Sequence, residues 1–212
     1  MQELLVSTPT HGRVLVRPAD SPSGTLVGFH GYMENADTQM ERLASLEGCD
    51  DWTLVSPQAL NRFYKGRSQA VVASWMTRQD REVTIEDNIG YIDRVVAQVV
   101  KASTPIVFAG FSQGVAMAFR AAARGARKGA AVIAVGGDVP PELLVDASVE
   151  FPRVLLARGE RDEWYTAAKL DADVAALNAR GVNVESFVHS GGHEWNAEVS
   201  RAAGRFIASR FG

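Results

Sequence analysis

Short apolar runs alternate along this chain with segments of helical periodicity. Residues 106–109, 131–135 and 153–157 are mostly apolar runs bounded by proline, glycine or charged residues, which is typical of buried strands. Residues 84–101 instead place apolar side chains at every third or fourth position, which indicates an amphipathic helix. Because the central runs do not alternate with polar residues, both faces of the sheet should be covered. The pattern therefore predicts a three-layer α/β fold with a mostly parallel sheet and helices on both faces.

The predicted elements cover most of the chain from residue 13 onward. Thr84 is interpreted as a helix N-cap, with Asp87 three residues later as in a capping box. A long polar and aromatic loop is predicted for residues 56–77, and loops of this length in compact domains are often functional. Strands are predicted at residues 13–17, 25–29, 52–55, 106–109, 131–135, 153–157 and 182–188. Helices are predicted at residues 34–47, 84–101, 113–120, 166–179 and 194–210.

Composition narrows the class of protein. The 212 residues are 46% hydrophobic, enough for one sizeable core, so we expect one domain spanning residues 1–212. A net charge of −3 argues against a nucleic-acid partner. Cys49 is the only cysteine, so neither a disulfide framework nor a cysteine metal cluster is expected. The N-terminus lacks the features of a signal peptide and no run is long enough for a membrane span, so we expect a soluble, cytoplasmic protein.

Residues 110–114 read Gly-Phe-Ser-Gln-Gly and lie between the strand at 106–109 and an Ala-rich helix. A Gly-x-Ser-x-Gly pattern on a strand-to-helix turn is the nucleophile elbow, in which the chain reverses so tightly that glycine fits best two positions before and two positions after the serine. The turn should hold the Ser112 hydroxyl clear of the sheet, at the start of a helix. Ser112 is therefore the candidate nucleophile.

A serine nucleophile needs a base to accept its proton. In an α/β sheet, reactive side chains gather beyond the carboxyl ends of the strands. His193 lies there, in a Gly-Gly loop after the last strand, and is our candidate base. His189 is the rival, but it lies in or beside the strand and is interpreted as a structural or surface histidine.

The base in turn needs a carboxylate that orients it. Asp162 follows the strand at 153–157 and is the candidate acid. Asp138 follows the strand at 131–135 and remains an alternative, while pairing of Asp162 with a neighbouring arginine would leave it merely structural. The order Ser, Asp, His along the chain is the one that this fold uses.

The loop after the strand at 25–29 fits an oxyanion hole. Backbone N–H groups stabilise a developing oxyanion without reorganising, and we assign this role to those of Gln113 and Tyr32. His30 is expected to hydrogen-bond the loop rather than to act in catalysis.

Together these pieces resemble the phospholipase/carboxylesterase family of α/β-hydrolases, which includes acyl-protein thioesterases and small bacterial carboxylesterases. The resemblance covers about residues 25–210 and implies a Ser112, Asp162 and His193 triad, no separate cap domain, no metal and no cofactor. The family often has x-Gly-Asp after His-Gly, where this chain has Met33 and Glu34 after Tyr32, and another glycine after the elbow, where Val115 would narrow the pocket. The matching pieces are His30-Gly31, Gly110-Phe-Ser-Gln-Gly114, Arg158-Gly-Glu-Arg-Asp162, Ala179-Arg-Gly-Val-Asn183 and Gly192-His193-Glu194.

We therefore predict a serine hydrolase that cleaves small carboxylic esters or thioesters through an acyl-enzyme on Ser112. The alternatives are a non-catalytic scaffold that binds a ligand or partner in the same cleft, and an acyltransferase with the same triad. Without a cap, the cleft should be open and suit acyl chains of roughly two to eight carbons. The sequence leaves the oligomeric state open, a homodimer included. Aromatic side chains predicted to line the substrate site are Tyr32, Phe63, Trp75 and Trp164, with Tyr64, Tyr165 and Trp195 as further candidates for the rim.

Overall fold

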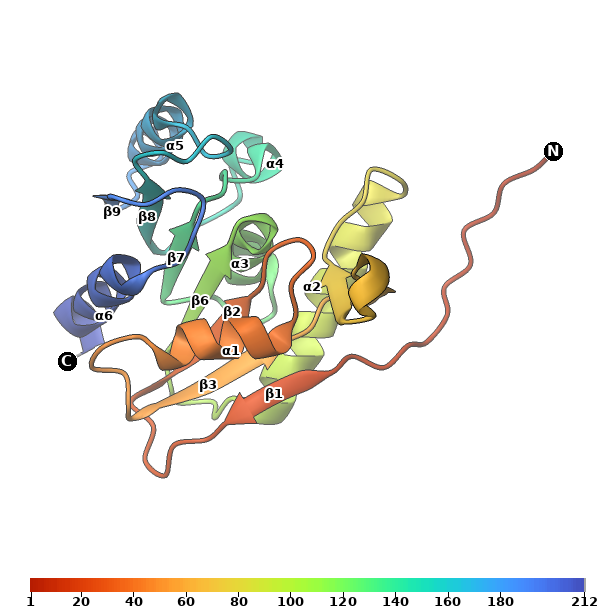
Figure 1. Cartoon of the computed structure of the whole chain (residues 1–212), viewed down its shortest axis with the longest axis horizontal. Helices are drawn as coiled ribbons and strands as arrows, with labels where there is room; N and C mark the ends of the chain where they lie inside the picture. The colour runs from red at the N-terminus through yellow and green to blue at the C-terminus, as the bar shows by residue number, and fades with distance from the viewer. Residues whose placement is uncertain (212) are drawn as a thin grey trace.

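The computed structural model describes residues 1–211 and is built around a seven-stranded sheet (Figure 1). Its strand order is β1, β3, β2, β6, β7, β8, β9. Only β1 runs antiparallel to its neighbour, and every other neighbouring pair in this sheet is parallel, which confirms the predicted sheet. The strands are β1 (Val14–Arg17), β2 (Gly24–Phe29), β3 (Trp52–Pro57), β6 (Ile106–Phe111), β7 (Ala131–Val135), β8 (Arg153–Gly159) and β9 (Val184–His189).

Helices cover both faces of the sheet, as predicted. α1 (Ala36–Ala44) and α6 (Ala197–Phe211) pack on one face, where Figure 1 shows them in front of the strands. The other face is covered by α2 (Arg81–Val99), α3 (Gln113–Arg124), α4 (Pro141–Val145) and α5 (Ala167–Ala179).

Alternate residues of the central strands supply the two halves of the core. In β6, Ile106 and Phe108 pack with the helices of one face, and Val107 and Ala109 pack toward α1 and α6 on the other. All four are at most 1% exposed. Side chains of a strand point alternately to opposite faces, so a strand covered on both sides must be apolar throughout.

The start of α2 corrects one sequence prediction. The helix begins at Arg81, with Asp80 as its N-cap, and not after Thr84. The Thr84 hydroxyl donates to the carbonyl of Asp80 at 2.8 Å, so it lies inside the first turn and bonds backward. A threonine can satisfy its hydroxyl on the preceding turn as well as at a cap, so the pattern alone does not separate the two. α4 was not predicted, and the other boundaries differ by a few residues.

The predicted loop at residues 56–77 is partly wrong. Within it, β4 (Asn61–Tyr64) and β5 (Val71–Ser74) form an antiparallel pair joined by the short 3₁₀ helix η1 (Gly66–Ser68). Ala73 of β5 exchanges backbone hydrogen bonds with the loop after β2: it accepts from Met33 and donates to Glu34. The hairpin is therefore fixed against the loop that we predict to form the oxyanion hole.

No helix within residues 1–211 is both long enough and apolar enough to cross a lipid bilayer.

Candidate active site

Ser112 stands on a strained turn between β6 and α3. Its φ of 51° and ψ of −119° are unusual for a residue with a side chain. The turn is held by a hydrogen bond of 2.8 Å from the Ser112 N–H to the carbonyl of Val135 in β7. Such strain persists only where surrounding contacts enforce it.

The two glycines of the pattern are required by close backbone contacts. A Cβ atom on Gly110 would overlap the carbonyl of Gly114, and one on Gly114 would overlap the carbonyl of Phe29. Backbone cannot yield as a flexible side chain can. The sequence at 110–114 therefore forms the elbow because no larger residue fits at its two ends.

The structure brings Ser112, His193 and Asp162 into one hydrogen-bonded row. The Oγ atom of Ser112 lies 2.9 Å from Nε2 of His193, and Nδ1 of His193 lies 2.9 Å from Oδ2 of Asp162. When Nδ1–H donates to the carboxylate, Nε2 carries the lone pair that accepts the serine proton. The imidazole is thus oriented to act as a general base on Ser112.

Hydrogen bonds to both oxygens of Asp162 stabilise its ionised form. Its side chain is 1% exposed, and its second oxygen, Oδ1, accepts from the N–H groups of Trp164 and Tyr165 at 2.8 and 2.9 Å. Burial opposes ionisation, but the hydrogen bonds from Tyr165, His193 and Trp164 outweigh it and hold the pKa of Asp162 below its ordinary value.

The loop after β9 brings His193 close to the elbow, because this loop packs against the end of β8. The N–H of Glu160 donates to the carbonyl of His189 at 2.7 Å, and that of Arg161 donates to the carbonyl of Gly191 at 3.0 Å. A side chain on Gly159 would overlap the carbonyls of this loop. The close packing of two loops that lie far apart in the sequence therefore places the imidazole.

The rival side chains lie outside this row. Asp138 is exposed and pairs with Lys169 at 3.1 Å. His189 is 1% exposed, and its Nδ1 accepts from the N–H of Gly191 at 3.1 Å, while burial lowers the pKa of the ring. His11 is exposed. None of the three is hydrogen-bonded to Ser112, whose hydroxyl pairs with His193 within residues 1–211.

Two backbone N–H groups, one in the loop after β2 and one at the start of α3, have no acceptor among the described residues. They are those of Tyr32 and Gln113. His30 is buried beneath the loop, where Nδ1 contacts the carbonyl of Gly31 at 2.7 Å and Nε2 accepts from the N–H of Ala59 at 3.1 Å. Burial lowers the pKa of His30, so the ring is a neutral, structural support.

An ion pair that we did not predict fixes the same loop. Oε2 of Glu34 accepts from the N–H of Gly31 at 2.7 Å, and Arg42 of α1 holds both Glu34 oxygens at 2.6 and 2.7 Å. The Arg42 guanidinium also lies 4.1 Å from the ring centre of Phe111, which in turn packs on His193. The acidic residue three positions after Gly31 was the available signal, but its partner is visible only in the fold.

The Gln113 side chain was also missed as a structural link. Its Oε1 accepts from the N–H of Trp75 at 2.8 Å, and its Nε2 donates to the carbonyl of Met76 at 3.0 Å. These bonds tie the end of β5 to the elbow, so one residue both presents an N–H group and fixes the wall beside it.

The sequence model of the phospholipase/carboxylesterase family matches residues 11–208. The chain belongs to this family. It is accordingly a serine hydrolase of the carboxylesterase and thioesterase type, and the predicted resemblance is confirmed. None of the curated proteins matches its sequence at a significant level.

Solved structures agree with the fold of the family. Esterase PE8 matches with a TM-score of 0.80 and 19% identity, covering 94% of this chain and 99% of that one. Acyl-protein thioesterase 2 of Zea mays matches with a TM-score of 0.74 and 19% identity, covering 95% and 100%. A phospholipase/carboxylesterase from Dyadobacter fermentans matches with a TM-score of 0.70 and 18% identity, covering 97% and 98%. These likenesses show the α/β-hydrolase fold, and no separate cap domain is evident in residues 1–211.

A pocket of about 550 Å³ opens beside Ser112 in this esterase-family chain. Its lining comes from the elbow and α3, from the segment after β7, from the end of β5 and the segment before α2, and from the segment after β8. The residues that line it are Trp75, Met76, Thr77, Arg78, Arg81, Ser112, Gln113, Ala116, Arg120, Gly136, Gly137, Asp138, Val139, Pro140, Pro141, Trp164, Tyr165 and Lys169.

The predicted aromatic residues divide between this pocket and other places. Trp164 lines the pocket and is 75% exposed, in the position of a rim residue. Tyr32 is exposed and packs on Phe63 at 5.9 Å between ring centres, but neither is among the lining residues. Tyr64 is exposed on the hairpin, whereas Trp195 lies in a separate hollow between α1 and α6.

Trp75 is among the residues that line the pocket, but it lies at the base, and the expectation for Val115 requires a correction. Trp75 is 1% exposed, packs on Phe29 and donates its ring N–H to the carbonyl of His30, so it forms the base of the pocket rather than a rim. A large apolar ring with one satisfied N–H is stable in a core. Tyr165 is likewise buried. Val115 is fully buried against Gly137 and does not line the pocket, so it does not narrow it as expected.

Proposed function

We propose that this protein hydrolyses carboxylic esters, and thioesters of similar size, through an acyl-enzyme on Ser112. The observation that carries the proposal is the hydrogen-bonded row of Ser112, His193 and Asp162 at the mouth of a pocket. Such a row has a clear chemical use in a hydrolase, because it couples a nucleophile to a base and the base to a carboxylate. This arrangement favours an enzyme over a non-catalytic scaffold.

In the first half-reaction, Oγ of Ser112 attacks the carbonyl carbon while Nε2 of His193 takes the hydroxyl proton. The carbonyl oxygen becomes an oxyanion, for which the unpaired N–H groups of Tyr32 and Gln113 are the donors. When the intermediate collapses, the carbon–oxygen bond of the leaving group breaks, and the leaving oxygen receives the proton from His193. Asp162 holds the imidazole in place and stabilises its positive charge between these steps.

In the second half-reaction, water replaces the departed alcohol or thiol. His193 takes a proton from the water as it attacks the acyl carbon, and then returns the proton to Oγ of Ser112. The acid is released and the enzyme is restored. The mechanism needs no metal and no cofactor, since every proton moves between Ser112, His193 and water.

The size of the pocket supports short or medium acyl groups. A volume of about 550 Å³, open to solvent, suits a small ester rather than a long lipid chain. We propose that the remainder of a larger substrate contacts Trp164, which lines the pocket, and the stacked pair of Tyr32 and Phe63 outside it.

The test is labelling with a fluorophosphonate probe together with hydrolysis of p-nitrophenyl butyrate. Wild type should be labelled and active, whereas Ser112→Ala should be unlabelled and should lose about 10⁴-fold or more in kcat, because triad members act as a unit. Ser209→Ala removes an exposed serine hydroxyl at the end of α6 and serves as the control, with normal labelling and turnover. Labelling of a folded Ser112→Ala protein at the wild-type level would refute the proposal.

A further inference from the structure

The pocket beside Ser112 is more basic than the protein that contains it. Among its lining residues, four are cationic, Arg78, Arg81, Arg120 and Lys169, and one is acidic, Asp138. The whole chain carries a net charge of −3, so this local excess runs against the overall charge. A cleft lined by one sign of charge attracts ligands of the opposite sign.

Neighbouring carboxylates do not cancel this excess. Lys169 is neutralised by Asp138 at 3.1 Å. Arg120 and Arg81 share one carboxylate, that of Glu142, at 2.6 and 3.7 Å. Arg78 makes no ion pair and no side-chain hydrogen bond within residues 1–211, so about two positive charges remain without a partner.

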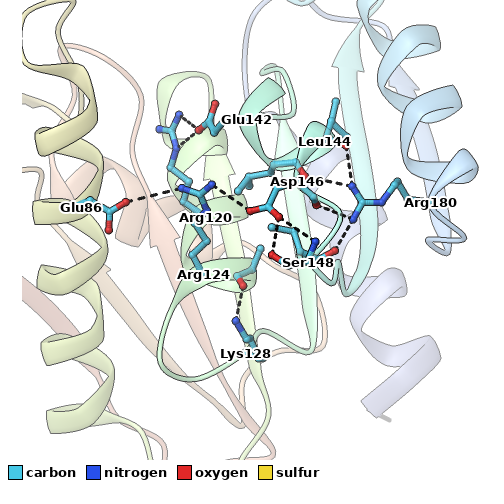
Figure 2. A network of polar contacts seen from close by, with 12 residues as sticks. Glu86, Arg120, Arg124, Lys128, Glu142, Leu144, Asp146, Ser148 and Arg180 are labelled. Carbon is cyan, nitrogen blue, oxygen red and sulfur yellow. Dashed lines mark hydrogen bonds and ion pairs between the residues drawn. The ribbon is translucent and has the colours of Figure 1, made fainter.

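Arg120 gives the pocket a fixed cationic wall. Its side chain is only 2% exposed, and its Nε and Nη2 atoms both donate to Oε1 of Glu142, at 2.8 and 2.6 Å (Figure 2). Its Nη1 atom donates to no acceptor within residues 1–211, although the residue lines the pocket. A guanidinium presents its donors in a rigid fork, so a buried arginine with a free N–H pair can receive a carboxylate without rearranging.

The wall that carries Glu142 is itself braced. Arg180 of α5 donates to the carbonyls of Leu144, Asp146 and Val149 at 2.8, 3.1 and 2.6 Å, and Arg124 of α3 lies 3.8 Å from the Asp146 carboxylate. Figure 2 shows these side chains reaching the α4 segment from both sides. The cationic wall is thus preorganised, which lowers the cost of ordering it around a ligand.

The position of His193 indicates which part of a substrate enters this pocket. His193 must give its proton to the leaving group, so the leaving group has to lie beside Nε2 of His193. The pocket is lined by Ser112 and Gln113 but not by His193. The acyl part of the ester is therefore the part that extends toward the arginines.

From these contacts we infer that the natural substrates are esters or thioesters whose acyl group ends in a carboxylate, as in the half-esters of dicarboxylic acids. This inference rests on the proposed function and names its substrate class. Arg78 and Arg81 recognise the terminal carboxylate at the mouth, and Arg120 presents an N–H pair on the inner wall. Cation and anion attract most strongly at low salt, because exposed charges are screened over roughly 8 Å at physiological ionic strength.

The experiment compares the half-ester and the diester of the same dicarboxylic acid. Hydrolysis of monomethyl adipate, which carries one carboxylate, and of dimethyl adipate, which carries none, is followed by proton release in a pH-stat. Wild type should prefer the anionic ester by about tenfold or more in kcat/KM, and the preference should shrink as salt is raised. A preference for the neutral diester, or none, would overturn the inference.

Variants assign the preference to the pocket. The double substitution Arg78→Gln and Arg81→Gln should bring the ratio of the two kcat/KM values close to one. The matched control, Arg201→Gln with Arg205→Gln, removes two exposed arginines of α6 on the opposite face of the sheet and should leave the ratio as in wild type. Equal ratios in the two double variants would overturn the inference, because they would place the selectivity elsewhere.

Binding separates this inference from the proposed function. Calorimetric titration of Ser112→Ala with monomethyl adipate needs no turnover, and its Kd should rise about tenfold when Arg78→Gln and Arg81→Gln are added. Unchanged binding would contradict the carboxylate site even if esters are hydrolysed. Conversely, normal binding with an unlabelled, inactive wild type would contradict the acyl-enzyme and leave the anion site supported.

Discussion

At the scale of single residues, Asp162 shows how its environment selects one carboxylate. Both of its oxygens are engaged, one by His193 and the other by two backbone N–H groups, and it is buried. Asp138, at the end of the neighbouring strand, is exposed and faces Lys169. The two acids have similar positions in the sequence pattern, but only Asp162 lies behind the imidazole.

We expect Asp162→Asn to lower kcat by roughly 10³- to 10⁴-fold, because an amide can stabilise the wrong histidine tautomer and cannot neutralise the imidazolium. Asp138→Asn should change kcat for a neutral ester by less than about threefold, since this residue does not touch the row. Steady-state kinetics with p-nitrophenyl butyrate measures both. A larger loss at Asp138 would move the acid to the end of β7.

At the scale of elements, the elbow and the loop after β2 are held by different means. The elbow depends on two glycines that approach backbone, whereas the loop depends on the Glu34 carboxylate between Gly31 and Arg42. The first is a steric requirement and the second an electrostatic one. Substitutions should separate them by their dependence on pH.

Gly114→Ala should destabilise the protein by about 3 kcal/mol or more, because the new Cβ would overlap the carbonyl of Phe29 and must displace backbone. Gly90→Ala is the matched control within α2, where the nearest atom to a new Cβ is the end of Arg94 at 3.6 Å. That control should be neutral or should stabilise the helix by about 0.5–1 kcal/mol. Urea unfolding measures both free energies, and equal effects would argue against a steric role for Gly114.

Glu34→Gln should lower kcat by about tenfold with a smaller change in KM, since the loop that presents the Tyr32 N–H loses its ionic anchor. Burial opposes ionisation of Glu34, but its bonds to Arg42 and Gly31 hold its pKa below the ordinary value. A group with a lowered pKa in the folded state stabilises the fold above its unfolded pKa and loses that effect as pH falls through the folded value. The difference in Tm between wild type and Glu34→Gln should therefore be full above about pH 4.3 and shrink at lower pH. A difference that stays constant from pH 7 to pH 3 would contradict the ionic anchor.

At the scale of the whole molecule, no separate cap stands over Ser112 in residues 1–211, and the pocket beside it is about 550 Å³. The helices of the chain cover the two faces of the sheet (Figure 1), and the pocket is lined by residues that follow the carboxyl ends of β6, β7 and β8. An open pocket of this size limits how much of an acyl chain can be removed from water.

Across a series of neutral p-nitrophenyl esters, kcat/KM should rise with acyl length up to about eight carbons and then level or fall. Each buried CH₂ contributes about 0.8 kcal/mol, or nearly fourfold, only while the chain still contacts the walls. The series from acetate to palmitate measures this. A maximum at palmitate would contradict the prediction and require a long acyl site beyond the pocket described here.

The sequence by itself determined the features that depend on local backbone geometry. Continuous apolar runs predicted strands buried on both faces, and the two glycines around Ser112 predicted the elbow, because these patterns act over a few neighbouring residues. The order Ser112, Asp162, His193 could also be inferred, since the ends of parallel strands meet at one edge of the sheet. The capping-box interpretation at Thr84 was wrong, because the same local pattern fits a threonine at the N-cap and one inside the first turn.

Only the tertiary structure decided which distant groups meet. His193 comes within 2.9 Å of both Asp162 and Ser112, which lie 31 and 81 positions away in the chain, because β8 lies between β7 and β9 in the sheet. The burial of Trp75, the pairing of Glu34 with Arg42 and the cationic wall at Arg120 arise in the same way. Side-chain pairing and burial depend on which surfaces the folded elements bring together, and no short window of sequence contains that information.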